Sequence, residues 1–269
     1  QALLAFGNPV YGAGHSDSRG ATRGARRAPT KQSAEKLSKL RVSLTRDTSE
    51  LTWENLDGTA IEVKNIAALA YADRQKEMAQ HVHTGVAANV DRILALRAQN
   101  KIGDYQYIHF AVHGLFVDGN PALNALVLTL PEKAKEHKRA EYDAYVKAQP
   151  LSSDGYLRAG DISSLNLNAE LVVMSACETS LGHEVGGEGM VALPQSFLTA
   201  GARSVVASLW SVDDAATSLF MQRFYQYLLK DKQRPKQALA MTQRDFRELA
   251  EFSAYRDPFY WAAFVIYGE

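Results

Sequence analysis

The sequence predicts an α/β fold with a largely parallel sheet and helices on both of its faces. Two observations lead to this prediction. Short apolar runs bounded by glycine or polar residues indicate buried strands, and they alternate with longer segments whose apolar residues recur at helical spacing. Strands joined through helices lie parallel, and the helices then cover both faces of the sheet. A chain of 269 residues is long enough to close one such core.

The first half of the chain predicts three strands and two helices. Residues 3–6 are apolar and precede the sequence Gly-Asn-Pro, which ends a strand. The polar segment 12–34 indicates a loop. Apolar residues at helical spacing predict helices at 61–72 and 86–99, and apolar runs predict strands at 82–86 and 105–112.

The middle of the chain predicts a hairpin strand and an insertion. The apolar run at 125–130 predicts the hairpin strand. Residues 131–150 are charged and have proline at both ends, which indicates an inserted segment that is either flexible or a solvated helix. The residues leave open whether this insertion is a lid, a partner site, a cleavage site or an inert excursion of the surface.

The second half of the chain alternates regularly between strands and helices. Apolar runs predict strands at 171–176, 203–210 and 261–267, and helical spacing predicts helices at 189–200, 213–229 and 235–250. The second of these helices begins with acidic residues. The third begins with Pro235, a residue favoured in the first turn of a helix.

Composition excludes several classes of function. Thirty basic and thirty acidic residues give a net charge of +0, so nothing at the level of the whole chain attracts nucleic acid or an anionic membrane. One cysteine makes neither an internal disulfide nor a cysteine-rich metal site, and it indicates a reducing compartment. No apolar stretch approaches the roughly 18 residues of a membrane span, and no signal-peptide pattern opens the chain. The chain begins inside an apolar run, so we expect a module of a longer protein.

The single cysteine occupies the position of a nucleophile. Cys177 follows the predicted strand 171–176, and His113 and Gly114 follow the predicted strand 105–112. In open α/β sheets, ligands bind outside the carboxyl ends of the strands. If the two strands are parallel neighbours, a thiol and an imidazole meet at that edge, which is the layout of a cysteine–histidine hydrolase.

The chemistry of such a site needs these residue types. A thiol attacks only as thiolate, and a neighbouring histidine takes its proton and later returns it to the leaving group. Gly114 has no Cβ, so its backbone N–H and that of Cys177 are candidates for an oxyanion hole. Taken singly, Cys177 is more often a small buried hydrophobe and His113 a satisfied core or surface histidine. Their joint placement favours the dyad.

Metal and nucleotide sites have weaker support. His109 and His113 have the separation of a zincin pair, but they lie in a predicted strand with no glutamate between them. His81 and His83 lack a third ligand. The glycines at 186–189 are not followed by the Lys-Ser/Thr of a phosphate loop, and we interpret them as a loop beside the nucleophile. We therefore predict no metal and no cofactor.

The same residues resemble the signature blocks of the CHAT family, caspase-like domains usually found with tetratricopeptide repeats. The two strongest blocks are 109–114, His-Phe-Ala-Val-His-Gly, and 171–182, which contains Ser-Ala-Cys-Glu-Thr-Ser. Further blocks agree in order at 187–198, 200–214 and 258–268, with lesser agreement at 4–9 and 58–63. The resemblance spans nearly the whole chain and is weakest at 12–56 and 131–150.

The resemblance implies a caspase-like three-layer α/β/α sandwich with a mostly parallel central sheet of about six strands. It implies one domain over 1–269, the C-terminal module of a longer protein, with 12–56 and 131–150 as variable loops or insertions. It also implies a mostly bacterial, cytoplasmic protein that hydrolyses peptide bonds with the dyad of His113 and Cys177. A regulatory domain or partner, such as tetratricopeptide repeats, is expected to activate it.

Two other functions remain open at this point. The first is a catalytically silent interaction module that keeps the fold. The second is a cysteine-dependent acyl transferase that uses the same dyad. Both catalytic positions are filled, which favours the endopeptidase.

Acidic residues in the sequence predict which type of residue precedes the cleaved peptide bond. Asp213 and Asp214 follow the strand 203–210, and Asp213 is a candidate helix cap. The pattern Leu-Trp-x-Val-x-Asp resembles that of the separases, which implies that Asp214 lies in the substrate pocket. A carboxylate there favours a guanidinium or an ammonium and repels Asp or Glu, so we predict cleavage after Arg or Lys. Glu184 and Glu188 are secondary acidic candidates.

Overall fold

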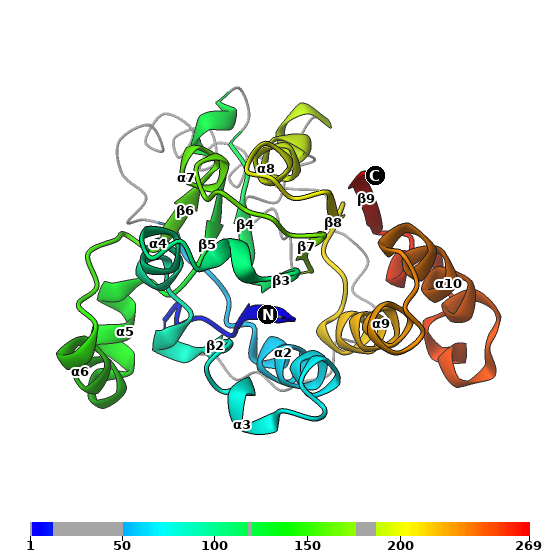
Figure 1. Cartoon of the computed structure of the whole chain (residues 1–269), viewed down its shortest axis with the longest axis horizontal. Helices are drawn as coiled ribbons and strands as arrows, with labels where there is room; N and C mark the ends of the chain where they lie inside the picture. Colours follow the sequence, from blue (N-terminus) through cyan, green and yellow to red (C-terminus); the bar gives the residue numbers. More distant parts are fainter. Residues whose placement is uncertain (1, 13–50, 118–119, 176–186) are drawn as a thin grey trace, which may run out of the picture.

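The computed structural model describes residues 2–12, 51–117, 120–175 and 187–269, and its centre is a six-stranded sheet (Figure 1). The strand order is β2-β1-β3-β7-β8-β9. The first five strands run parallel, and β9 is antiparallel to β8. Their bounds are β1 Leu3–Gly7, β2 Val82–Thr84, β3 Tyr107–Ala111, β7 Leu171–Met174, β8 Ser204–Ser208 and β9 Phe264–Gly268. The predicted α/β fold with about six mostly parallel strands is confirmed.

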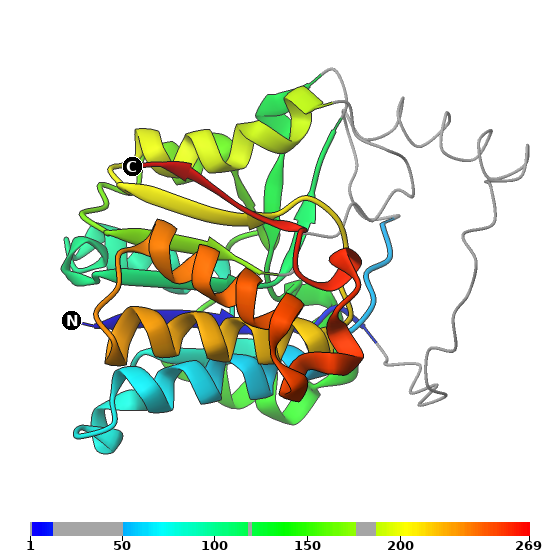
Figure 2. The ribbon, with the colours of Figure 1, turned by 90° about the vertical axis from the view of Figure 1, so that its right-hand side faces the viewer.

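Helices cover both faces of this sheet, which makes three layers (Figure 2). One face packs against α2 (Asp57–Ala70), α9 (Asp214–Tyr225) and α10 (Pro235–Glu248), and the other against α4 (Val90–Ala98), α7 (Ala159–Ser163) and α8 (Gly187–Thr199). Successive strand residues point to opposite faces. Leu3 and Ala5 accordingly pack in the core on the side of α2, α9 and α10, and Leu4 and Phe6 pack in the core on the side of α4, α7 and α8.

Capping decides where several helices begin. The side chain of Asp213 accepts hydrogen bonds from the N–H groups of Ala215 and Ala216 at 3.0 and 3.1 Å and starts α9. Asn89 accepts from Arg92 N at 2.8 Å, so α4 begins at Val90 and not at 86 as predicted. A 3-10 turn over 85–87 fills the gap. The predicted helix 213–229 is α9 followed by a π-helical turn over 226–230.

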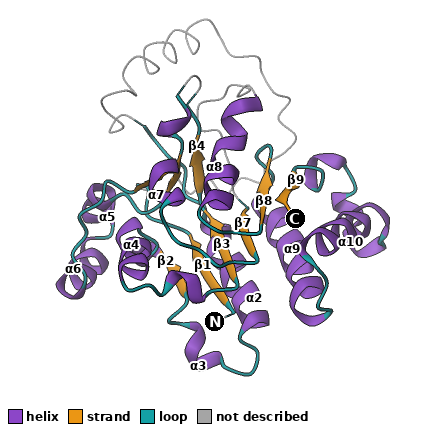
Figure 3. Ribbon diagram, turned by 45° about the horizontal axis from the view of Figure 1, so that its top comes forward, coloured by secondary structure: helices purple, strands orange, loops and turns teal. Residues whose placement is uncertain are grey.

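A second, smaller sheet was not predicted. It is antiparallel, in the order β4-β5-β6, with β4 His113–Leu115, β5 Ala125–Val127 and β6 Tyr156–Arg158. The predicted strand 105–112 ends at Ala111, and the chain bends at Val112 so that His113 starts β4 above the end of β3 (Figure 3). The predicted hairpin strand 125–130 is β5. Strand β6 is only three residues long, too short for a periodic signal.

The charged segment 131–150 is helical, as one of its two predicted alternatives proposed. It forms α5 (Pro131–His137) and α6 (Arg139–Ala148), which lie at the β2 edge of the molecule (Figure 1). Glu141 Oε1 accepts a hydrogen bond from Val86 N at 3.0 Å, and Ala134 is buried against Val10 and Val86. Strand β1 separates the β2 edge from β3, so these helices attach away from the β3–β7 pair. Among the described helices, none has the length and apolar character needed to cross a membrane.

Candidate active site

Strands β3 and β7 are parallel neighbours, as the sequence predicted. Their register pairs Tyr107 with Leu171 and Phe110 with Met174, and Ser175 N donates to Phe110 O at 3.0 Å just beyond the last pair. Cys177 follows Met174 by three residues, as His113 follows Phe110. Cys177 itself lies outside the described residues. The two strands that precede the predicted dyad residues therefore end side by side.

The imidazole of His113 is held in one orientation. The side chain is 1% exposed, and its Nε2 lies 2.7 Å from the backbone oxygen of Glu54. A carbonyl oxygen only accepts, so Nε2 carries a proton. In the neutral imidazole the lone pair is then on Nδ1, which is the nitrogen that acts as a base. The backbone carbonyl of Glu54 is thus the group that orients His113.

Two aromatic rings flank His113. The ring of Tyr11 lies 4.9 Å from the imidazole and that of Trp53 lies 5.3 Å away, measured between centroids. Tyr11 OH donates to Val127 O at 2.6 Å and accepts from His113 N at 3.2 Å. Trp53 Nε1 donates to Tyr156 OH at 3.1 Å. The aromatic enclosure, as we call Tyr11, Trp53 and Tyr156, thus ties His113 to both β5 and β6.

Sequence analysis missed this enclosure and the Glu54 carbonyl. Trp53 and Glu54 belong to the segment 12–56 that was predicted to be a variable loop, Tyr11 directly precedes that segment, and Tyr156 lies on the unpredicted strand β6. The only signal in the sequence is that three apolar residues, Leu51, Trp53 and Leu56, interrupt a polar stretch, and all three are buried. A backbone carbonyl has no signature in the sequence at all.

The hydroxyl of Tyr11 gives a test of the enclosure. Tyr11→Phe removes one buried donor and one buried acceptor, which leaves Val127 O and His113 N short of a partner. We expect the free energy of unfolding to fall by about 1–3 kcal/mol, measured by chemical denaturation. The control is Tyr145→Phe, which loses a surface hydrogen bond to Gln149 of 2.9 Å. Equal effects of the two substitutions would contradict the role given to Tyr11.

Gly114, which was predicted to donate to the oxyanion, is also needed for packing. It lies in β4 and is buried, and an added Cβ would come within 2.8 Å of Phe116 Cε2. Its N–H remains a prediction as an oxyanion donor. The second predicted donor, the N–H of Cys177, lies outside the part of the chain that the structure describes.

The structure describes the side chains of two of the four predicted acidic residues, Asp213 and Asp214. Asp213 is the N-cap of α9, which confirms the predicted cap. Asp214 is the first residue of α9, is exposed, and lies so close to Gly58 that a Cβ there would be 3.0 Å from Asp214 Oδ2. Because α9 follows β8, both carboxylates stand at the same edge of the sheet as His113. Glu184 and the side chain of Glu188 lie outside the described residues.

Three other histidines that the structure describes, His81, His83 and His109, are buried. His81 Nδ1 lies 2.9 Å from Tyr105 OH, and His109 Nε2 lies 2.8 Å from Glu62 Oε1. Burial lowers the pKa of His83 to about 3, so its imidazole is neutral at ordinary pH. Within the described ranges, no three His, Cys, Asp or Glu side chains lie close enough together to hold a metal ion.

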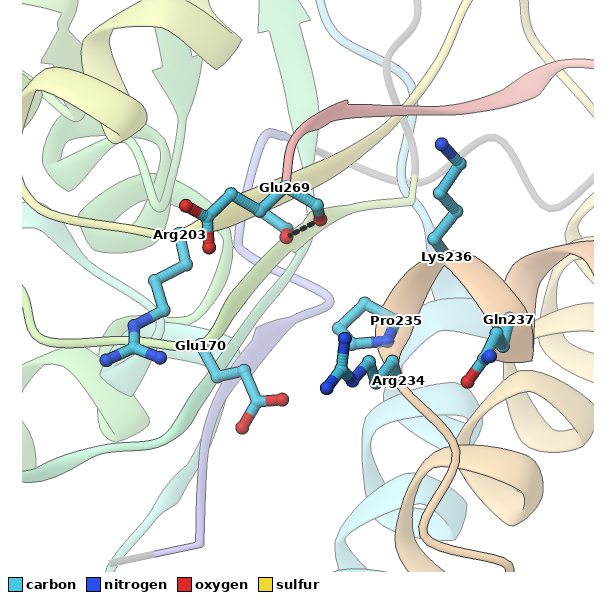
Figure 4. A pocket seen from close by; sticks show the side chains of 8 residues that line it. Glu170, Arg203, Arg234, Pro235, Lys236, Gln237 and Glu269 are labelled. Atoms are coloured by element: carbon cyan, nitrogen blue, oxygen red, sulfur yellow. Dashed lines mark hydrogen bonds between the residues drawn. The ribbon is translucent and has the colours of Figure 1, made fainter.

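A cavity of about 450 Å³ lies at the opposite edge of the sheet (Figure 4). Its lining includes Arg203 and Ser204 at the start of β8, and Glu269, whose backbone oxygen accepts from Ser204 Oγ at 2.8 Å. The catalytic edge of a parallel sheet is the carboxyl edge. This cavity is therefore not part of the candidate active site.

Comparisons with known proteins identify the family of this chain. The family model described as the CHAT domain matches residues 10–269. Tetratricopeptide repeat protein 28 of Homo sapiens is 28% identical over 198 residues, which are 68% of this chain and 8% of that protein. The protein of the same name from Mus musculus is 29% identical over 186 residues, 64% of this chain and 7% of that protein.

The chain thus spans less than a tenth of the length of these curated relatives. Both relatives are mammalian, and the bacterial origin implied by the resemblance stays a prediction. The family match covers both dyad positions, the second sheet and every strand of the central sheet except β1. The chain belongs to the CHAT domain family, whose fold is caspase-like.

Proposed function

We propose that this CHAT domain is a cysteine-type endopeptidase in which His113 is the base and Cys177 the nucleophile. The observation that carries the proposal is the parallel pairing of β3 and β7, together with the 2.7 Å hydrogen bond that orients His113. Cys177 is two residues beyond Ser175, so covalent geometry keeps its Cα within about 7 Å of the Cα of Ser175. That reach supports a meeting of thiol and imidazole at the carboxyl edge of the sheet.

The proposed reaction has two steps. His113 Nδ1 takes the proton of Cys177 Sγ, and the thiolate attacks the peptide carbonyl carbon. The tetrahedral intermediate collapses, the peptide C–N bond breaks, and the imidazolium gives its proton to the leaving amine. His113 then takes a proton from water, the resulting hydroxide attacks the thioester, and the acid product leaves with the thiol restored.

Glu54 has a defined part in this proposal. Its carbonyl keeps the proton on Nε2 and stabilises the imidazolium that forms during the reaction. A carboxylate plays this part in serine hydrolase triads, and it also keeps the histidine in the correct tautomer. The N–H groups of Gly114 and Cys177 are the proposed donors to the oxyanion.

A thiol-reactive peptide probe tests the proposal directly. An endopeptidase site should be labelled at Cys177 much faster than free cysteine, and the rate should fall in a variant that lacks the base. A catalytically silent interaction module predicts labelling no faster than that of an ordinary thiol. Product analysis with and without an added amine acceptor separates hydrolysis from acyl transfer.

We further propose that attached tetratricopeptide repeats or a partner protein regulate the domain. The name of the two relatives supports this, and so does the burial of His113 beneath Trp53. His113 is 1% exposed, so its imidazole cannot contact a peptide substrate from solution unless the residues around it rearrange. Labelling of Cys177 should therefore become faster when the regulator is present.

A lone nucleophilic thiol also suits a reducing, cytoplasmic compartment, and we propose the cytoplasm as the location of the protein.

The substrate pocket gives a specificity prediction. We propose that Asp214 pairs with a basic side chain before the cut, so that the protein cleaves after Arg or Lys. Asp214→Ala should lower the preference for basic over neutral residues by about ten- to a hundredfold, because a charge-assisted hydrogen bond is lost. A peptide-library cleavage profile measures this change.

Asp213 is the matched control for Asp214, because it is the neighbouring carboxylate and caps α9. Asp213→Ala should lower stability by about 0.5–2 kcal/mol and leave the cleavage profile unchanged. Asp213→Asn keeps the cap and should be close to neutral. A preference for acidic or large apolar residues, or a profile indifferent to Asp214→Ala, would overturn the pocket assignment.

A further inference from the structure

A second polar cluster lies buried beneath the two strands that carry the dyad. His109 on β3 is 0% exposed, and its Nε2 lies 2.8 Å from Glu62 Oε1 on α2 and 3.3 Å from Ser175 Oγ just after β7. Its Nδ1 lies 3.2 Å from Tyr225 OH on α9. Glu62 is 1% exposed and Ser175 is 3% exposed. We call Glu62, His109, Ser175 and Tyr225 the buried network.

The protonation of the network follows from its partners. A carboxylate only accepts, so the Nε2–H of His109 donates to Glu62, and the same N–H makes the longer contact to Ser175 Oγ. Burial and the nearby Glu62 carboxylate raise the pKa of Tyr225 well above its usual range, so its hydroxyl keeps its proton. That hydroxyl donates to Nδ1 when the imidazole is neutral. Each of the two imidazole nitrogens of His109 therefore has a partner on another element.

The alternation of strand residues explains why these groups meet. Leu171 and Val173 of β7 face the α2 and α9 layer, and so does Tyr107 of β3. His109 lies two residues after Tyr107, and Ser175 two residues after Val173, so both point into the same layer. His113 and Cys177 come four and two residues later in these same segments. The buried network thus joins the ends of both dyad-bearing strands to α2 and α9.

Stability alone does not account for such a network. Burying a carboxylate and an imidazole is costly unless they are paired, and an apolar set of similar volume is often neutral or more stable. The network does, however, hold the side chain of Ser175 through the contact of its Oγ with His109, while its backbone N donates to Phe110 O at 3.0 Å. Ser175 lies two residues before Cys177, so covalent geometry ties the placement of Cys177 to that of Ser175.

We propose that His109 is a positioning residue that, through Ser175, sets the placement of the segment leading to Cys177. Glu62 and Tyr225 keep the imidazole of His109 turned toward Ser175. This inference rests on the proposed function, in which Cys177 forms a thiolate beside His113. Because α2 and α9 both hold His109, a shift of either helix is transmitted to the strand end that precedes the nucleophile.

The test uses the reactivity of the only cysteine in the chain. Iodoacetamide alkylation of Cys177 is followed against pH in the whole chain. Ser175→Ala should slow alkylation at neutral pH by about tenfold and move its midpoint up toward the free-thiol value near about 8.5, because the thiol–imidazole contact loosens. If the variant also cleaves peptides, kcat should fall by a similar factor and KM should stay unchanged.

Ser204→Ala is the matched control. Ser204 is also a buried serine of the sheet, 2% exposed, but it lies at the opposite edge, where its Oγ donates to Glu269 O. It should keep the alkylation profile of the unmodified chain.

The double variant Glu62→Met with His109→Leu distinguishes a loss of positioning from a loss of stability, because it replaces the charged pair by apolar groups of similar size. We expect it to unfold no earlier and to show the same slow alkylation as Ser175→Ala.

The outcomes are distinct. An unchanged alkylation profile in Ser175→Ala overturns the positioning role, and the network is then structural only. If the unmodified chain already alkylates with the midpoint of an ordinary thiol, the proposed dyad itself fails, and the positioning role fails with it. If the profile of the unmodified chain is shifted but that of Ser175→Ala matches it, the dyad stands and only the positioning role is lost.

Discussion

Replacing Cys177 by alanine should abolish peptide hydrolysis, with a loss of about 10⁴-fold or more in kcat/KM. The sequence contains no other cysteine, so no second thiol can act in its place. Without Sγ, no thioester forms, and His113 alone offers only general-base assistance to water. Cleavage of a peptide selected for the unmodified protein, followed by product separation, measures this loss.

The fold of the Cys177→Ala variant must be shown to persist. Removal of one sulfur atom is a mild change, and the midpoint of chemical unfolding should move little. The variant Cys177→Ser adds a second check, since a hydroxyl of similar size is a far weaker nucleophile than a thiolate. Full activity in Cys177→Ala would end the endopeptidase proposal and leave the silent interaction module as the function to test.

Replacing His113 should cost nearly as much activity. His113→Gln keeps an N–H that can donate to the Glu54 carbonyl, but it has no lone pair that takes a proton at neutral pH. We expect a loss of about 10³-fold or more, because members of a catalytic unit fail together. The double variant with Cys177→Ala should be no worse than either single variant, which the same hydrolysis assay measures.

The control for this substitution is His137→Gln on α5. Its side chain is about one quarter exposed and contacts only Glu136, at 3.4 Å, among the ion pairs of the described residues. It should retain full activity. A His113→Gln variant that hydrolyses peptides as fast as the unmodified protein would show that His113 is not the base, whatever the reactivity of Cys177.

The strands of the central sheet were within reach of the sequence. Each catalytic candidate directly follows an apolar run with strand character, and a strand end is a local feature that six or seven residues specify. The cap at Asp213 was predictable for the same reason, since an acidic residue at a helix start accepts N–H bonds from its own next turn.

The bend at Val112 was not within reach, and it changes how the site is built. The run at 105–112 continues without a break in hydrophobicity, so periodicity alone extends the strand to its end. In the structure β3 stops at Ala111 because His113 pairs with Val127 of β5 in another sheet. That pairing joins residues 14 positions apart. Local pattern carries no information about it.

The partners of the histidines depend on tertiary structure for the same reason. Glu54 lies 59 residues before His113, Tyr11 lies 102 residues before it, and Tyr225 lies 116 residues after His109. Such contacts arise only when strands, helices and the 51–56 segment have packed together. The sequence by itself therefore determined most strands of the central sheet, several helices and the candidate reactive side chains, because these are local features. Tertiary structure alone decided which groups orient and bury them, because a backbone carbonyl, an aromatic flank and a buried carboxylate acquire a role only from their neighbours in space.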